Sequence, residues 1–225
     1  MPIRAVVAAV ALATLTACGP ATPALSAPSA PATSAPATSA PGGPGALAPP
    51  KDLAPALAPG APLAVIPFTH PVTVTGNYAA HCTVHTVPGG TLPDPICTPG
   101  SLGDLVTQAT ITTTICAPNW TATVRPPTAA TDRIKTVALA VYGMPTAARA
   151  TTELDHKVPL ELGGSDDVTN LWPQPSDLPG KGFRNTKDTV ENTLKVAVCS
   201  KQVTLHDAQI AIATDWTTAR ARLHV

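Results

Sequence analysis

The sequence has few charged residues, and neither sign is in excess. Charged side chains make up 12% of the 225 residues, and 14 basic residues balance 14 acidic ones. Arg4, Lys51 and Asp52 are the only charges before Gly76, so the remaining residues, with their histidines neutral, carry 13 acids and 12 bases. A domain so close to neutrality is not expected to attract nucleic acid strongly through its net charge, although this does not speak against a local basic patch.

The apolar run at the N-terminus is too short to span a bilayer stably. Residues 1–17, MPIRAVVAAVALATLTA, place one arginine before this run, which is typical of an export signal peptide. The run ends in LTAC, which resembles the lipobox of bacterial lipoproteins, so Cys18 is expected to be lipidated and to become the new N-terminus. The alternative is an ordinary signal peptide with a chance cysteine nearby. A lipidated Cys18 would attach the protein to a membrane.

Residues 18–75 lack the composition of a folded domain. After Cys18 the chain is mostly Ala, Pro, Ser and Thr, and 14 of its 27 prolines lie between Pro20 and Pro71. Proline fixes φ and removes a backbone donor, which predicts a disordered, partly polyproline-II linker. Such a linker could span on the order of 100 Å, either to reach through a cell wall or simply as a spacer. The sequence therefore predicts a signal peptide (1–17), a linker (18–75) and one folded domain (76–225).

The cysteines of the predicted domain lack the CxxC spacing of a zinc knuckle. Four remain after Cys18, an even number in an exported chain, which favours two disulfides. Three pairings are open. We favour Cys82 with Cys97, a local link, and Cys116 with Cys199, which would tie an early helix to a late one.

Hydrophobic periodicity predicts a mixture of helices and extended segments. Helices are expected at 131–142, 186–199 and 204–223, the last with a capping box formed by Thr204 and Asp207. Residues 104–116 fit a helix or a strand about equally well. The stretch 152–164 is expected to form a short hairpin or two extended pieces around Pro159, followed by a loop at 165–183. No internal repeat is visible, and the predicted fold class is α+β.

Three segments in this order resemble the HNH endonucleases, in particular exported bacterial members. They are ELDHKVPLELGG (153–164), NLWPQP (170–175) and KDTVEN (187–192), and shorter pieces such as CTPG, TIC, VRPP, VCS and AIATDW extend the resemblance to about residues 97–217. The resemblance implies a small ββα-metal motif embedded in a mainly helical, disulfide-stabilised domain. It also implies a metal-dependent endonuclease that hydrolyses DNA, with RNA as the alternative, shows little sequence preference and leaves a 5′-phosphate and a 3′-hydroxyl.

The resemblance assigns roles to three residues of these segments. His156 is expected to be the general base that takes a proton from the attacking water, a role that a near-neutral imidazole suits. Asp155 is expected to bind the metal. Asn170 occupies the middle position of the motif, where its amide is expected to brace the loop of the catalytic site.

The third position of the motif departs from a simple match, because no histidine occurs between His156 and His206. Asn185 is the favoured metal ligand there, with Asp188 close behind and Glu191 less favoured. Glu153 is either a second acidic ligand or a charge on the strand surface. Such oxygen ligands favour one Mg²⁺ or Mn²⁺ ion.

Basic residues near the motif are candidates for phosphate binding, namely Lys157, Arg184 and Lys187, with Lys181 beside them, although all four could simply be solvated. Arg125 also matches the family, but the sequence gives no physical account of it. The expected partners are nucleic acid and, through the N-terminal lipid, a membrane, and no nucleotide cofactor is expected. The alternatives to a nuclease are a noncatalytic surface module that keeps the scaffold for binding and, on the linker alone, a wall-directed hydrolase.

Overall fold

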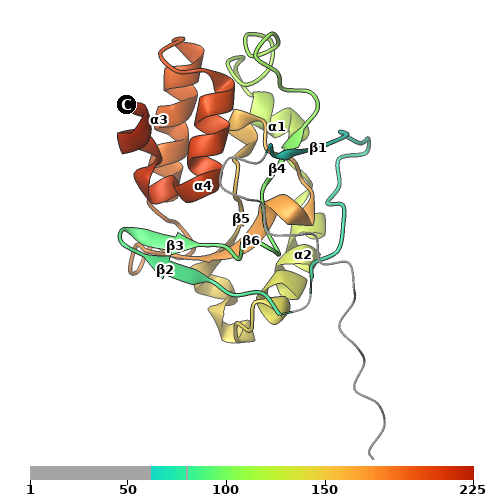
Figure 1. Cartoon of the computed structure of the whole chain (residues 1–225). Helices are drawn as coiled ribbons and strands as arrows, with labels where there is room; N and C mark the ends of the chain where they lie inside the picture. The colour runs from blue at the N-terminus through green and yellow to red at the C-terminus, as the bar shows by residue number, and fades with distance from the viewer. Residues whose placement is uncertain (1–61, 80) are drawn as a thin grey trace, which may run out of the picture. The chain divides into compact units, whose positions relative to one another are not determined.

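The computed structural model describes residues 62–79 and 81–225, which form a mixed α+β fold with two disulfides (Figure 1). The predicted α+β class with two disulfides is therefore confirmed. Within these residues the strands pair as three two-stranded sheets: β1 (Ala64–Ile66) parallel to β4 (Ser101–Gly103), β2 (His85–Val87) antiparallel to β3 (Gly90–Leu92), and β5 (Thr152–His156) antiparallel to β6 (Leu171–Pro175). The α-helices are α1 (Trp120–Val124), α2 (Thr128–Val141), α3 (Lys187–Cys199) and α4 (Leu205–Leu223), and short 3-10 turns cover Thr146–Thr151, Leu160–Leu162 and Val168–Asn170.

The domain begins earlier than the sequence predicted. Strand β1 lies within the segment assigned to the linker, yet it pairs with β4. Thr75 also donates its backbone N–H to Asp166 and accepts one from Val168. The described fold therefore starts before the predicted boundary at residue 76, because the short proline-free stretch between Pro62 and Pro67 can pair with β4. The predicted signal peptide, the lipidation site Cys18 and the linker up to residue 61 lie outside the described residues.

The pairing partner of β5 is not the one predicted. The residues after Pro159 form a 3-10 turn, in which the Pro159 carbonyl accepts the N–H groups of Leu162 and Gly164. A Cβ atom at Gly164 would lie 1.8 Å from the Val158 carbonyl oxygen, so only glycine fits this turn. The strand that pairs with β5 is β6, which falls in the predicted loop. Its prolines are tolerated because each strand of a two-stranded sheet has a free edge.

The helices agree better with the prediction. Helix α2 starts three residues before the predicted position, and α3 begins one residue after it. At the start of α4, the Thr204 hydroxyl accepts the Asp207 backbone N–H, as the predicted capping box requires. Residues 104–116 form turns rather than a helix or a strand, because hydroxyls such as those of Thr110 and Thr114 bond to nearby carbonyl groups.

The main hydrophobic core lies where α3 and α4 pack side by side (Figure 1). Leu194 and Val198 of α3 meet Ile212 and Trp216 of α4 in a cluster that also holds Ile115. None of the helices in the described part of the chain is long and apolar enough to span a membrane.

The two disulfides have the favoured pairing. Cys82 is bonded to Cys97, and Cys116 is bonded to Cys199 across 83 residues of sequence. The second bond ties the end of α3 to the segment before α1. In the chain-entropy model the two bonds contribute about 3 and about 4.5 kcal/mol.

Candidate active site

His156 ends strand β5 and is held by an acid that the sequence analysis did not single out. Its imidazole Nε2 lies 2.9 Å from Asp166 Oδ1, and both side chains are 11% exposed. When Asp166 accepts a hydrogen bond from Nε2–H, the ring nitrogen Nδ1 is left with a free lone pair. A neutral His156 in this tautomer can accept a proton at Nδ1. The only signal for Asp166 in the sequence was the pair of adjacent acids in SDDVTN.

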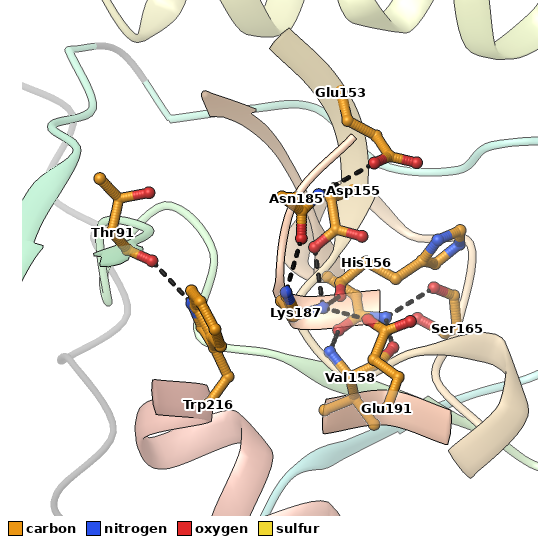
Figure 2. A network of polar contacts seen from close by, with 11 residues as sticks. Thr91, Glu153, Asp155, His156, Val158, Ser165, Asn185, Lys187, Glu191 and Trp216 are labelled. Atoms are coloured by element: carbon orange, nitrogen blue, oxygen red, sulfur yellow. Dashed lines mark hydrogen bonds and ion pairs between the residues drawn. The ribbon is translucent and has the colours of Figure 1, made fainter. Parts of the chain in front are cut away.

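Asp155 faces a buried ammonium group. Lys187 Nζ lies 2.8 Å from Asp155 Oδ2, donates to the His156 carbonyl oxygen at 2.7 Å and forms an ion pair with Glu191 (Figure 2). Burial opposes the charge on Lys187, but the two carboxylates outweigh it and raise the pKa of the ammonium. The His156 ring points away from this cluster. The prediction that Lys187 binds phosphate is therefore corrected, because its side chain is 1% exposed and engaged inside the protein.

Asn185 uses both ends of its side-chain amide within the protein. Its Oδ1 accepts the Lys187 backbone N–H at 3.0 Å, at the start of α3, and its Nδ2 donates to Glu153 Oε2 at 3.0 Å (Figure 2). The oxygen that was expected to bind a metal is therefore engaged in holding the helix end. Asn185 and Asp188 were the two residues favoured as metal ligand at the third position of the motif. Because Asn185 is buried and Asp188 is exposed, Asp188 has the more accessible oxygens.

Asn170 is fully buried and joins three backbone groups around the turn that follows β5. Its Oδ1 accepts the Val158 N–H at 2.9 Å, and its Nδ2 donates to the carbonyl oxygens of Val158 and Ser165, both at 2.9 Å. Ser165 immediately precedes Asp166. Asn170 thus fixes both the strand end that carries His156 and the loop that carries its hydrogen-bond partner.

Two clefts meet at His156. The first, which we call the acidic cleft, has a volume of about 320 Å³ and is lined by Arg125, Glu153, Asp155, His156, Glu161, Asp188 and Glu191, among others. Burial raises the pKa of the Glu153 carboxyl to about 7, and the negative charges of Asp155 and Asp188 add to this effect. The pKa of Asp188 is raised for the same two reasons, burial and the nearby Asp155. Negative charge is therefore in excess here.

The second cleft, which we call the Phe183 cleft, has a volume of about 310 Å³ and different chemistry. Arg125, Glu153 and His156 belong to its wall as well. Lys135 and Phe183 line only this cleft, together with the acids Asp132 and Asp166. Arg125, which matched the family without a physical explanation, thus lies in the walls of both clefts. It forms no ion pair with any other described residue.

The other predicted phosphate-binding residues, Lys157 and Arg184, line neither of the two clefts. Lys157 donates from Nζ to the Thr98 carbonyl oxygen at 3.0 Å and lines a separate pocket beside Trp172. Burial lowers the pKa of its ammonium to about 8, although Asp94 acts against this. The prediction that Lys157 binds phosphate beside His156 is therefore corrected, because its side chain lines a different pocket. Arg184 is exposed and contributes to neither cleft wall, so its role stays a prediction.

The acidic cleft fits a divalent cation by its donor chemistry. Carboxylate oxygens are what Mg²⁺ and Mn²⁺ prefer, and a cation would act against burial and the nearby carboxylates, which together raise the pKa values of Glu153 and Asp188. No three His, Cys, Asp or Glu side chains within residues 62–79 and 81–225 are already grouped as a metal site. Mg²⁺ is often held by one or two carboxylates and several waters. Asp155 and Asp188 are the residues placed to do this.

Comparisons with protein-family models, with curated proteins and with solved structures give no match for this chain. The relation to the HNH endonucleases therefore stands on the quoted segments alone, and the activity is argued below as a proposal.

Proposed function

We propose that the chain is an HNH-type, metal-dependent endonuclease that hydrolyses phosphodiester bonds of nucleic acid with little sequence preference. The observation that carries the proposal is His156, which is oriented by Asp166 at the point where an acid-lined cleft meets a cleft with free cations. The chain order β5, β6, α3 is also the order of a ββα motif. In this proposal β5 carries the base and one metal ligand, and α3 carries the other.

The hydrolytic step begins with proton transfer. His156 Nδ1 takes a proton from a water molecule while Asp166 keeps the ring in place and balances the imidazolium that forms. The water oxygen bonds to phosphorus, and the bond from phosphorus to the 3′-oxygen breaks. The 3′-oxygen takes up a proton, so the products are a 5′-phosphate and a 3′-hydroxyl. General-base catalysis of this kind contributes about 10²- to 10⁴-fold.

The surrounding residues position the phosphate and support its charge. A divalent cation on Asp155 and Asp188 would supply positive charge for the phosphate oxygens and for the leaving 3′-oxygen. Arg125 contributes a guanidinium from the common wall of both clefts, with the fork of donors that suits phosphate. The Lys187 ammonium group holds Asp155 and the His156 carbonyl group in place.

We further propose that the protein acts outside the cytoplasm, attached to a membrane through a lipid on Cys18. The two disulfides favour an oxidising compartment, because such bonds rarely persist in a reducing cytosol. The proline-rich segment would then separate the nuclease domain from the membrane.

A noncatalytic binding module is the second candidate, and Lys187 is the observation that favours it. Its ammonium already supplies positive charge beside Asp155 and Glu191, so the carboxylates could be a purely structural ion cluster. Titration of the chain with Mn²⁺ by calorimetry separates the candidates. Stoichiometric binding that is lost in Asp188→Asn favours the nuclease, whereas no binding favours the module.

The experiment that tests the nuclease is nicking of supercoiled plasmid by the oxidised full-length chain with Mg²⁺, with Mn²⁺ and with EDTA. We expect metal-dependent nicking that is lost in His156→Ala. His206→Ala is the matched control, because His206 is an exposed histidine on α4 outside both clefts and should not matter. Absence of nicking with either metal would overturn the proposal.

A further inference from the structure

We propose that the Phe183 cleft binds an unpaired nucleotide next to the scissile phosphate, so that the preferred substrate is single-stranded nucleic acid. This assignment rests on the proposed nuclease function and names its substrate class. Phe183 would stack on the base, while Arg125 and Lys135 would contact the flanking phosphates.

The first support is the setting of the Phe183 ring. Phe183 is 52% exposed and is the one aromatic ring among the exposed large apolar side chains of the described residues. A single exposed apolar side chain is ordinary. This one, however, lines a cleft together with His156, and Lys135 Nζ lies over its ring, 5.6 Å from the centroid. An aromatic surface beside a proposed catalytic base is what a stacking platform requires.

The second support is the way the chain presents this ring. Gly180 and Gly182 have positive φ angles of 73° and 68°, so the chain turns sharply just before Phe183. The base of the loop is closed by hydrogen bonds, since Asp177 accepts the Thr186 N–H at 2.8 Å and Ser176 donates its hydroxyl to the Arg184 carbonyl oxygen. Phe183 therefore lies on a loop between β6 and α3 whose base is closed by hydrogen bonds.

The third support is the charge that the Phe183 cleft leaves available to a ligand. Its acids are already engaged: Asp132 is paired with Arg149 at 2.8 Å, Asp166 holds His156, and Glu153 accepts a hydrogen bond from Asn185. Its cations are different. Arg125 and Lys135 form no ion pair with any residue in the described ranges. The cleft thus offers two cations without a carboxylate partner beside an aromatic ring, and cations and an aromatic face are the two components of single-strand binding sites.

The substrate class follows from what stacking requires. The bases of a duplex are already stacked on their neighbours, so a duplex base could reach Phe183 only after being flipped out at an energetic cost. An unpaired base pays little of this cost. Because His156 lies in the wall of both clefts, a phosphate placed at His156 has a neighbouring nucleotide within the Phe183 cleft.

The test is binding of a fluorescently labelled single-stranded oligonucleotide and of its duplex to the oxidised full-length chain in EDTA, by anisotropy. We expect the single strand to bind more tightly. Phe183→Ala should weaken single-strand binding about 10-fold and leave duplex binding unchanged, while Phe183→Trp keeps it. Val196→Ala is the control, because Val196 is 64% exposed on α3 and lines neither cleft. Equal or tighter duplex binding, or an unchanged Phe183→Ala variant, would overturn the assignment.

Cleavage of the same two oligonucleotides with Mn²⁺ separates this assignment from the nuclease proposal. Binding that depends on Phe183 without any cleavage would overturn the nuclease and keep the single-strand site. Cleavage that does not depend on Phe183 and that favours the duplex would keep the nuclease and overturn the single-strand site.

Discussion

The acidic cleft and the Phe183 cleft share His156, Arg125 and Glu153, yet their other residues differ in charge. In the acidic cleft, burial raises the pKa of Glu153 to about 7, and the negative charges of Asp155 and Asp188 add to this effect. In the Phe183 cleft each acid has a partner, and the cations are free. The difference teaches that a nearly neutral domain can still place an acid-rich cleft next to a cleft whose cations have no carboxylate partner.

The largest effect is expected from replacing Lys187, whose buried ammonium group pairs with two acids that line the acidic cleft. Lys187→Met should lower the free energy of unfolding by about 3–5 kcal/mol, because Asp155 and Glu191 would then be buried without a counter-charge. Urea denaturation at neutral pH measures the change. The matched control is Lys195→Met, which breaks a more exposed pair with Glu161 at 3.7 Å and should cost less than about 1 kcal/mol. Similar losses in the two variants would contradict the buried role of Lys187.

The next effect concerns the orientation of His156, on which both clefts depend. Asp166→Asn should reduce kcat about 100-fold with little change in KM, because the amide no longer fixes the tautomer of the imidazole. Steady-state cleavage kinetics give the two constants. Asp167→Asn is the control: Asp167 caps the Val168–Asn170 turn through the Thr169 N–H and does not touch His156. If the kcat of Asp167→Asn fell as far as that of Asp166→Asn, the effect of replacing Asp166 would be merely structural.

A pair of variants tests whether the two clefts bind different ligands. Arg125→Ala should weaken binding of nucleic acid about 10-fold and reduce the slope of log K against log salt by about 1. It should leave Mn²⁺ binding intact. Asp188→Asn should do the reverse, with about a 10-fold loss in Mn²⁺ affinity. Anisotropy and calorimetry measure the two affinities, and equal effects of both variants on both ligands would contradict the separation of roles.

The smallest effect is a pH dependence of stability that arises in the acidic cleft. Burial raises the folded-state pKa of Glu153 from its ordinary value of 4.5 to about 7, so the folded state holds this proton more tightly than the unfolded state does. Stability should therefore fall by on the order of 1 kcal/mol as the pH rises from about 5 to about 8. Glu153→Gln should flatten the fall, and Mn²⁺ at pH 8 should offset it. Thermal melts across this range provide the measurement, and an unchanged slope in the variant would count against the charge excess.

Features set by neighbouring residues could be predicted from the sequence. The capping box at Thr204 and the positions of α2 and α3 depend on short-range signals, and all are present in the structure. The bond between Cys82 and Cys97 was favoured as a local link, and the structure contains it together with the bond between Cys116 and Cys199. The α+β class followed from these elements.

Features set by distant contacts could not be predicted in the same way. Strand β5 pairs with β6 and not with the residues directly after Pro159, because those residues form a turn in which Gly164 closely approaches Val158. The two prolines of β6 made this strand look like a loop in the sequence. Lys187 looked like any helix-surface lysine, because its partner Asp155 lies 32 residues earlier in the sequence. Asp166 was missed for a similar reason, since nothing in SDDVTN distinguishes it from Asp167.

The measurement that tests the central claim most directly is chemical rescue of the proposed base. Single-turnover cleavage of an oligonucleotide with Mn²⁺ would be followed for the oxidised full-length chain, for His156→Gly, and for His156→Gly with added imidazole. We predict a loss of at least about 100-fold in His156→Gly and a partial, imidazole-dependent recovery. Cleavage by His156→Gly at the rate of the unchanged chain, with or without imidazole, would contradict the assignment of His156 as the general base.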